Sequence, residues 1–254
     1  MAVTRAGDHA ELISRASYIV DQALGPPLAD VDVPAALRSA DTIAGRIDHT
    51  LLKADATATA IEKLCAEAKD HGFASVCVNT RWVSLASRLL AGTDVMVCTV
   101  VGFPLGATTS RAKAEEARIT VSEGAAEVDM VMDVGGLLSG DLPGVYQDIA
   151  GVVAASRPAP VKVILETCLL DDEQKAVGCL IALRAGAAYV KTSTGFGGGG
   201  ATTNDVALMR AVVGDRLGVK ASGGIRSRED AEAMIAAGAD RIGASASVAI
   251  AAGD

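Results

Sequence analysis

Short β-branched runs and alanine-rich stretches alternate along most of the chain. From about Arg46 onward one unit repeats: an apolar run, a turn, and a stretch in which apolar residues recur at helical spacing. Several helical stretches end in an Ala-Gly pair directly before the next apolar run, where glycine supplies a left-handed C-cap. The eight predicted strands are 47–51, 75–79, 94–101, 127–133, 161–166, 189–192, 218–222 and 241–243.

This alternation predicts an α/β fold with a parallel sheet, and eight units are the number that closes a (β/α)8 TIM barrel. A doubly wound open sheet is the competing fold. It is disfavoured because no GxGxxG motif opens the first unit and because eight strands exceed its usual six. We therefore predict a TIM-barrel domain over residues 45–254.

Residues 1–44 precede the first predicted strand. They contain one amphipathic helical candidate, residues 8–24, which the Gly25-Pro26-Pro27 segment closes. We expect an N-terminal helical extension that packs on the barrel or is mobile, in preference to a separate functional domain.

Charged residues interrupt the apolar strands. Side chains of a barrel strand point alternately inward and outward, which places Glu127, Asp129 and Asp133 on the inner side of their strand. Asp48 in the first strand adds another inward carboxylate. Buried carboxylates are costly unless they are paired. Three lysines in other strands could pair with them: Lys162, Lys191 and Lys220.

Lys191 and Lys220 each precede a glycine-rich turn at the end of the barrel that carries TIM-barrel active sites. A single strand lysine more often extends to the rim, but two such lysines favour function. Burial together with a second ammonium group lowers a lysine pKa from ~10.4 towards roughly 7 to 8. The neutral amine attacks a carbonyl to form a Schiff base, an electron sink that lets a neighbouring C–C bond break. Asp129 could relay protons there.

Glycine-rich turns supply a second candidate feature. Gly195, the Gly223-Gly224 pair and the segment around Ser245 follow the late strands, where TIM barrels commonly bind phosphate through backbone N–H groups. The run 197–200 has the same potential, but it could equally form tight turns.

The overall charge narrows the set of partners. The chain of 254 residues has 23 Lys plus Arg against 31 Asp plus Glu, a net charge of -8. We therefore expect no nucleic-acid or membrane partner. The five cysteines form no CxxC and the three histidines no HExxH, so we expect no metal site. Asp8 and Glu11 interrupt any signal-peptide pattern, which favours a cytoplasmic location. A homo-oligomer stays open.

Several motifs together resemble those of the deoxyribose-phosphate aldolases, which are class I aldolases. The resemblance spans the predicted barrel in order, and KTSTGF with VKASGGI is its most specific part. It implies reversible cleavage of 2-deoxy-D-ribose 5-phosphate to acetaldehyde and D-glyceraldehyde 3-phosphate, without a cofactor. The matching segments are IDHTLLKADAT (47–57), VCVN (76–79), TVVGFPLG (99–106), GAAEVDMVMDVG (124–135), KVILETCLL (162–170), KTSTGFGGGGAT (191–202) and GVKASGGIR (218–226).

The resemblance also implies roles for individual residues. Lys191 would form the Schiff base, Lys220 would favour its neutral form, and Asp129 would act in the proton relay. Phosphate would contact Gly223, Gly224 and Ser245. Further residues fall in family motifs without a settled role: Asp48, Asn79, Thr167, Lys162 and Cys77, the last favoured as a small buried hydrophobe. The sequence departs from some members at Ala246, where they have a second serine, and in lacking a C-terminal tail ending in tyrosine.

Two other functions compete with this interpretation. One is a different phosphate-binding barrel, either another Schiff-base aldolase or a sugar-phosphate isomerase. The other is a catalytically silent phosphosugar-binding protein. The presence of Lys191, Lys220 and Asp129 together argues against a silent relative.

Overall fold

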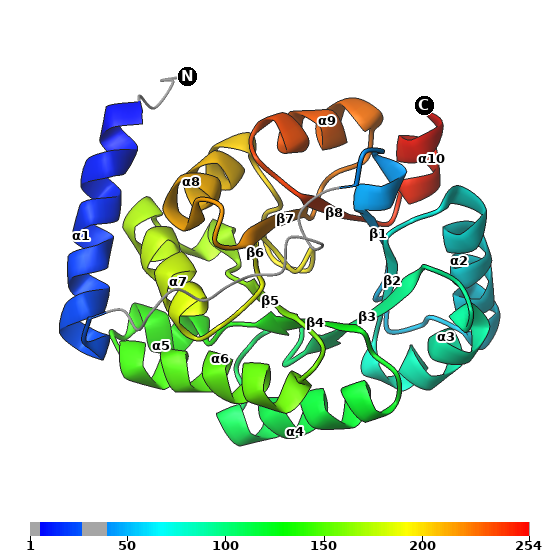
Figure 1. Cartoon of the computed structure of the whole chain (residues 1–254), viewed down its shortest axis with the longest axis horizontal. Helices are drawn as coiled ribbons and strands as arrows, with labels where there is room; N and C mark the ends of the chain where they lie inside the picture. The colour runs from blue at the N-terminus through cyan, green and yellow to red at the C-terminus, as the bar shows by residue number, and fades with distance from the viewer. Residues whose placement is uncertain (1–5, 27–39, 254) are drawn as a thin grey trace.

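A computed structural model describes residues 6–26 and 40–253. Each strand pairs in parallel with the next, and β8 pairs with β1, so the sheet is a closed barrel inside a ring of helices (Figure 1). All eight predicted strands are present, with ends within two residues of the prediction. The strands are β1 (Ile47–Leu51), β2 (Ser75–Val78), β3 (Met96–Val101), β4 (Glu127–Val131), β5 (Val161–Ile164), β6 (Tyr189–Lys191), β7 (Gly218–Ser222) and β8 (Arg241–Ala244).

Local signals in the sequence set the helix ends. Thr57 caps α2 by accepting a hydrogen bond from the Ala60 amide, and Asp171 forms a capping box with Gln174 at the start of α7. Gly186 follows α7 with a φ of 82°. The helices are α1 (Ala6–Leu24), α2 (Ala58–His71), α3 (Val83–Leu90), α4 (Ser110–Ser122), α5 (Val134–Leu138), α6 (Leu142–Ser156), α7 (Asp172–Arg184), α8 (Thr203–Val213), α9 (Arg228–Ala236) and α10 (Ser247–Ala252).

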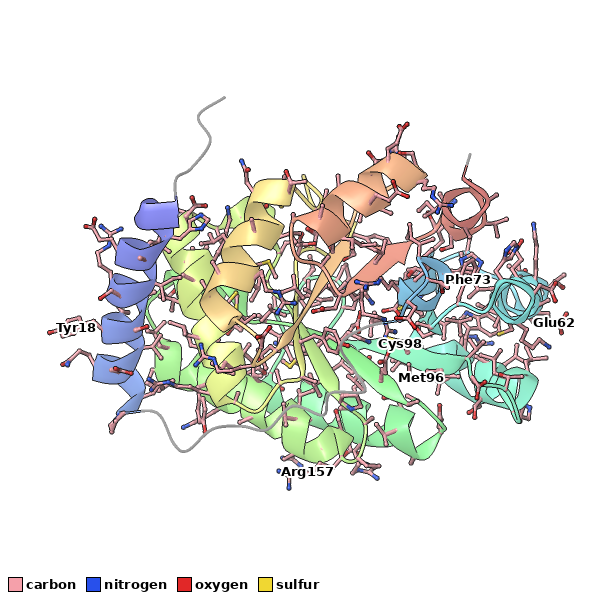
Figure 2. All side chains as sticks on the ribbon, turned by 45° about the horizontal axis from the view of Figure 1, so that its top comes forward. Tyr18, Glu62, Phe73, Met96, Cys98 and Arg157 are labelled. Atoms are coloured by element: carbon pink, nitrogen blue, oxygen red, sulfur yellow. The ribbon has the colours of Figure 1, made fainter. Side chains whose placement is uncertain are left out.

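Helix α1 lies outside the ring and packs along α7 (Figure 1). Its buried face includes Ala16 and Val20, whereas Tyr18 is 66% exposed and points away from the barrel (Figure 2). Arg184 of α7 donates to the Asp21 carboxylate and the Gly25 carbonyl. The predicted extension is therefore a packed helix. Its boundary with the barrel near residue 44 stays a prediction, and residues 27–39 lie outside the described residues.

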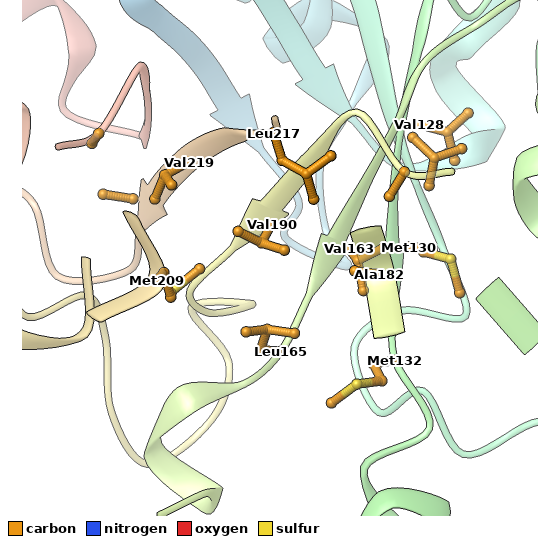
Figure 3. Close-up of a cluster of buried hydrophobic side chains, with 14 of the residues drawn as sticks. Val128, Met130, Met132, Val163, Leu165, Ala182, Val190, Met209, Leu217 and Val219 are labelled. Carbon is orange, nitrogen blue, oxygen red and sulfur yellow. The ribbon is translucent and has the colours of Figure 1, made fainter. Parts of the chain in front are cut away.

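The barrel wall has an apolar outer face and a charged inner face. Outward side chains of β4 to β7, such as Met130, Val163, Val190 and Val219, form a buried cluster with residues of the surrounding helices (Figure 3). The alternate positions carry buried charged groups instead. Bulky aliphatic residues usually fill a TIM-barrel interior. The hydrophobic layer between strands and helices holds this fold together, while the interior is free to hold ionisable groups.

The described helices were also compared with the dimensions of a lipid bilayer. Within residues 6–26 and 40–253, no helix combines the length and the apolar character needed to cross one.

Candidate active site

Asp129 stands at the centre of the charged interior. Its Oδ2 atom accepts hydrogen bonds from Lys191 Nζ at 2.8 Å and from Lys220 Nζ at 2.7 Å. Its Oδ1 atom accepts one from Lys162 Nζ at 2.9 Å. Strand register explains the convergence, since Asp129 is level with Lys162 and Lys191 is level with Lys220 on adjacent parallel strands. The structure thus brings together the carboxylate and all three strand lysines.

Asp48 on β1 forms the second anionic position. Its Oδ2 atom lies 2.5 Å from Lys220 Nζ and 3.8 Å from Lys162 Nζ, and its Oδ1 atom accepts from Ser75 Oγ at 2.7 Å and from the Arg241 guanidinium. Burial acts to raise the pKa of Asp48, but Arg241 and Lys220 outweigh it and hold that pKa below its ordinary value. Asp48 is therefore an ionised carboxylate in contact with Lys220.

Glu127 completes the interior carboxylates. It accepts from Lys162 Nζ at 2.8 Å and receives two Arg241 nitrogens at 3.0 and 3.1 Å. Three carboxylates then face four cationic side chains in the described barrel interior. The carboxylates are Asp48, Glu127 and Asp129, and the cations are Lys162, Lys191, Lys220 and Arg241.

This charge balance keeps Lys220 in its charged form. Burial acts to lower the pKa of Lys220, but Asp129 and Asp48 outweigh it and raise the pKa above its ordinary value. The same competition raises the pKa of Lys162. Two closely paired lysines thus keep their protons, and neither lends itself to nucleophilic attack. Lys191 differs because its one carboxylate oxygen is shared with Lys220.

A pocket of about 390 Å³ opens above this network at the carboxyl ends of the strands. Lys191 lines it, whereas Lys220 and Asp129 lie outside its lining. Its wall includes Gly195, Gly223, Gly224 and Ser245, the residues that the sequence analysis proposed for phosphate binding. Two further cations, Lys53 and Arg226, line it, and none of its described lining residues is an aspartate or glutamate. The pocket of this acidic chain is therefore suited to an anion.

Two other candidate residues support the pocket from outside its lining. Asn79 Nδ2 donates to the carbonyl of Leu52, a lining residue, at 3.0 Å. The Thr167 amide donates to the Thr192 carbonyl at 3.0 Å, and the Thr167 side chain is buried. Both residues therefore fix loops around the pocket.

The glycine run at 197–200 serves the close packing of its loop and does not line the pocket. A Cβ atom at Gly200 would lie 2.4 Å from the Gly223 carbonyl oxygen, and one at Gly199 would lie 2.7 Å from Cys168 Cβ. The glycines thus allow the loop to pass closely over its neighbours. Of this loop, Gly195 and not the run 197–200 lines the pocket.

Three further residues singled out in the sequence are Asp133, Cys77 and Ala246. The prediction for Asp133 was wrong, because β4 ends at Val131 and Asp133 caps α5 by accepting from the Gly136 amide at 3.0 Å. Cys77 is buried in a small apolar cluster inside the barrel, which fits a packing role. Ala246 stands at the start of α10 and offers no side-chain cap.

The buried thiols and carboxylates form two groups whose potential metal-ligand atoms lie close together. Cys77, Cys98 and Asp129 place ligand atoms close together, as do Asp48, Cys98 and Glu127. Ammonium or guanidinium groups already occupy these carboxylates. A divalent cation would add to an interior in which cations outnumber carboxylates, so neither group suits one.

A family model described as DeoC/LacD family aldolase matches residues 42–252, which is most of the chain. The chain belongs to the DeoC/LacD family of aldolases. The charged interior and the pocket above it are its candidate active site.

Individual relatives of the aldolase agree with this assignment. Deoxyribose-phosphate aldolase of Brevibacillus brevis is 60% identical over 187 residues, covering 74% of this chain and 85% of the relative. The Streptococcus gordonii enzyme of the same name is 58% identical over 208 residues, covering 82% and 94%. The solved tetrameric deoxyribose phosphate aldolase from Aeropyrum pernix superposes with a TM-score of 0.79 at 34% identity, covering 98% and 97%.

Sequence reasoning missed Lys53 and Arg226 in the pocket lining, Arg241 in the interior of the aldolase and Glu166 near its rim. The sequence analysis treated 241–243 as an apolar run and so overlooked Arg241. Its register partner is Lys220, which points inward. Glu166 stood at the end of a predicted strand, but its backbone is left-handed, with a φ of 56°, and its carboxylate is buried. Alternation along β8 could have revealed Arg241. No sequence pattern indicates the conformation of Glu166.

Proposed function

We propose that this aldolase catalyses reversible class I cleavage of 2-deoxy-D-ribose 5-phosphate to acetaldehyde and D-glyceraldehyde 3-phosphate. One observation carries the proposal: at the floor of an anion-suited pocket, Lys191 shares a single oxygen of Asp129 with Lys220. Lys220 is held as a cation by two carboxylates, so its charge disfavours a second ammonium beside it. Loss of the Lys191 proton leaves three cations facing three carboxylates.

The chemical steps follow from a neutral Lys191. Its amine attacks the C1 carbonyl of the open-chain sugar, and loss of water gives a protonated imine. A base removes the C3 hydroxyl proton, the C2–C3 bond breaks, and its electron pair moves into the imine to form an enamine. D-glyceraldehyde 3-phosphate leaves. Protonation of the enamine at C2 and hydrolysis release acetaldehyde and regenerate Lys191, with no cofactor in the cycle.

Other residues take supporting roles in this proposal. Asp129 and Lys220 move protons near the imine, and Asp48 fixes Lys220. Gly195, Gly223 and Gly224 offer backbone N–H groups to the phosphate, with the Ser245 hydroxyl beside them. Asn79 and Thr167 hold the surrounding loops. The partners are accordingly a phosphosugar and aldehydes, with no nucleic acid and no membrane; we also propose a cytoplasmic location and a homo-oligomeric assembly.

Borohydride reduction in the presence of acetaldehyde tests the mechanism. Reduction of the imine leaves an N-ethyl group, which peptide mass mapping is expected to locate on Lys191 alone. A Lys191→Met variant that folds should take up no label and cleave no substrate. Label spread over surface lysines, or a folded protein that takes up none, would reject the imine and favour an isomerase, which needs a base without an imine.

A further inference from the structure

Glu166 has a combination of features that a surface loop residue does not need. Its side chain is 5% exposed, and its backbone has a φ of 56° and a ψ of 62°. Glycine aside, no other residue in the described ranges 6–26 and 40–253 has a positive φ. Residues with side chains adopt this conformation at an energetic cost, and such residues concentrate at functional sites.

The Glu166 carboxylate acts on the loop that follows the Lys191 strand. Its Oε2 atom accepts from Thr194 Oγ1 at 2.5 Å and from the Thr194 amide at 3.3 Å. Thr194 Oγ1 in turn accepts from the Phe196 amide at 3.0 Å. None of the ion pairs found in the described part of the chain includes Glu166. Both hydrogen bonds that Glu166 Oε2 accepts therefore hold the loop that contains Thr194.

The bonds of Glu166 fix a turn that belongs to the pocket. Thr194, Gly195 and Phe196 all line it. Gly195 has a φ of 83° and approaches Gly223, whose Cβ position would lie 3.5 Å from Gly195 Cα. The turn therefore forms one wall of the proposed phosphate position. Lys191 itself lies three residues earlier, where strand pairing holds it independently.

We propose that Glu166 is a positioning residue that clamps the turn 194–196 against the phosphate end of the pocket. The clamp rests on the proposed function, because it shapes the pocket for a phosphosugar. It acts through Thr194 and contacts neither the imine nor the substrate. Its loss is expected to weaken binding of the phosphosugar while leaving the reactivity of Lys191 towards a small aldehyde intact.

Two substitutions test the clamp from its two ends. Glu166→Gln replaces the charged acceptor, and Thr194→Val removes the hydroxyl. Since a hydrogen bond to a charged group is worth about a tenfold change in an equilibrium, each variant is expected to raise KM for 2-deoxy-D-ribose 5-phosphate about tenfold. The bond between Thr194 Oγ1 and Glu166 Oε2 is common to both substitutions, so the double variant should raise KM by less than the product of the two single effects. The rate of borohydride trapping of acetaldehyde on Lys191 should stay unchanged.

A matched control and a direct structural measurement accompany these variants. Cys168→Ala removes a thiol 3.8 Å from Oε1, the other oxygen of Glu166, and is expected to leave KM unchanged. Hydrogen exchange should show faster exchange of the Thr194 and Phe196 amides in Glu166→Gln and Thr194→Val. Thr194→Ser, which keeps the hydroxyl, should restore the protection that Thr194→Val loses.

The outcomes separate the clamp from the proposed function. If the wild type cleaves the phosphosugar but both variants show an unchanged KM and unchanged amide exchange, the clamp alone is overturned. A fall in kcat and in acetaldehyde trapping at constant KM would also overturn it, since Glu166 would then act on Lys191. If the wild type neither cleaves the sugar nor traps acetaldehyde, the proposed function fails, while the exchange measurement still decides whether Glu166 holds the turn. If Glu166→Gln does not fold, Thr194→Val decides both readouts.

Discussion

Matched substitutions at Lys191 and Lys220 test the division of labour inside the barrel. The two lysines lie level on adjacent strands and donate to the same Asp129 oxygen, yet Lys220 also lies 2.5 Å from Asp48 Oδ2. Replacement of either by methionine removes one ammonium and keeps a flexible chain of similar volume. Any difference between the variants therefore reports the carboxylates that each lysine satisfies.

The expected magnitudes follow from the contacts that remain. In Lys191→Met, Asp129 Oδ2 still accepts from Lys220, so we expect a free energy of unfolding close to that of the wild type. In Lys220→Met, Asp48 Oδ2 is left with Lys162 Nζ at 3.8 Å. Breaking a buried ion pair on one side costs about 3 kcal/mol or more. At 2–4 °C per kcal/mol for a chain of this size, the melting temperature should fall by about 6–12 °C.

The two variants should also differ in their pH dependence. Lys191→Met has no nucleophile and should trap no acetaldehyde at any pH. Lys220→Met keeps the nucleophile but loses the neighbouring positive charge that disfavours protonated Lys191. Borohydride trapping on Lys191 should therefore require a higher pH than in the wild type. Thermal denaturation and trapping across pH 6–10 are the assays. Equal destabilisation by both substitutions, or trapping at an unchanged pH in Lys220→Met, would refute the charge-balance reasoning.

Three further predictions concern the pocket rim, one buried histidine and the glycine run. Arg226→Ala should raise KM for the phosphosugar up to about fivefold at constant kcat, because an exposed charge pair contributes at most about 1 kcal/mol; steady-state kinetics measure this. Burial holds the pKa of His49 below its ordinary value of 6.5, so unfolding free energy should fall as pH drops from 7 to 5, and less so in His49→Gln. Gly200→Ala should destabilise the fold by about 1–3 kcal/mol, since its Cβ would meet the Gly223 carbonyl, whereas Gly198→Ala has open space and should be neutral in urea unfolding.

The barrel itself could be predicted because its signals repeat. Every strand contains at least one β-branched residue, and the glycines after α4, α7 and α9 have the positive φ that the Ala-Gly pattern indicated. Alternation along β4 placed Asp129 inside, and the three strand lysines followed as its possible partners. It failed at Asp133, because alternation assumes that the strand continues. Asp133 instead accepts from the Gly136 amide and starts helix α5.

The electrostatic state of the site could not be predicted from residue types alone. Two lysines in neighbouring strands suggested mutual repulsion and a lowered lysine pKa. The structure places Asp129 and Asp48 against Lys220, and these two carboxylates raise the pKa of Lys220 above its ordinary value. Which lysine gains a carboxylate of its own depends on contacts between strands distant in sequence. Distances across a closed barrel decide this, and no local pattern encodes them.

The described barrel interior has one cationic side chain more than it has carboxylates, and this excess arises where the barrel closes. β8 returns to β1, and Arg241 thereby reaches both Asp48 and Glu127. With these two carboxylates engaged, Asp129 must serve the remaining lysines, and only its Oδ2 atom faces the two on β6 and β7. Lys220 has Asp48 as a second partner, but Lys191 does not. The lysine that shares its one carboxylate oxygen is also the one that lines the pocket, so a substrate carbonyl can reach Lys191 and not Lys220.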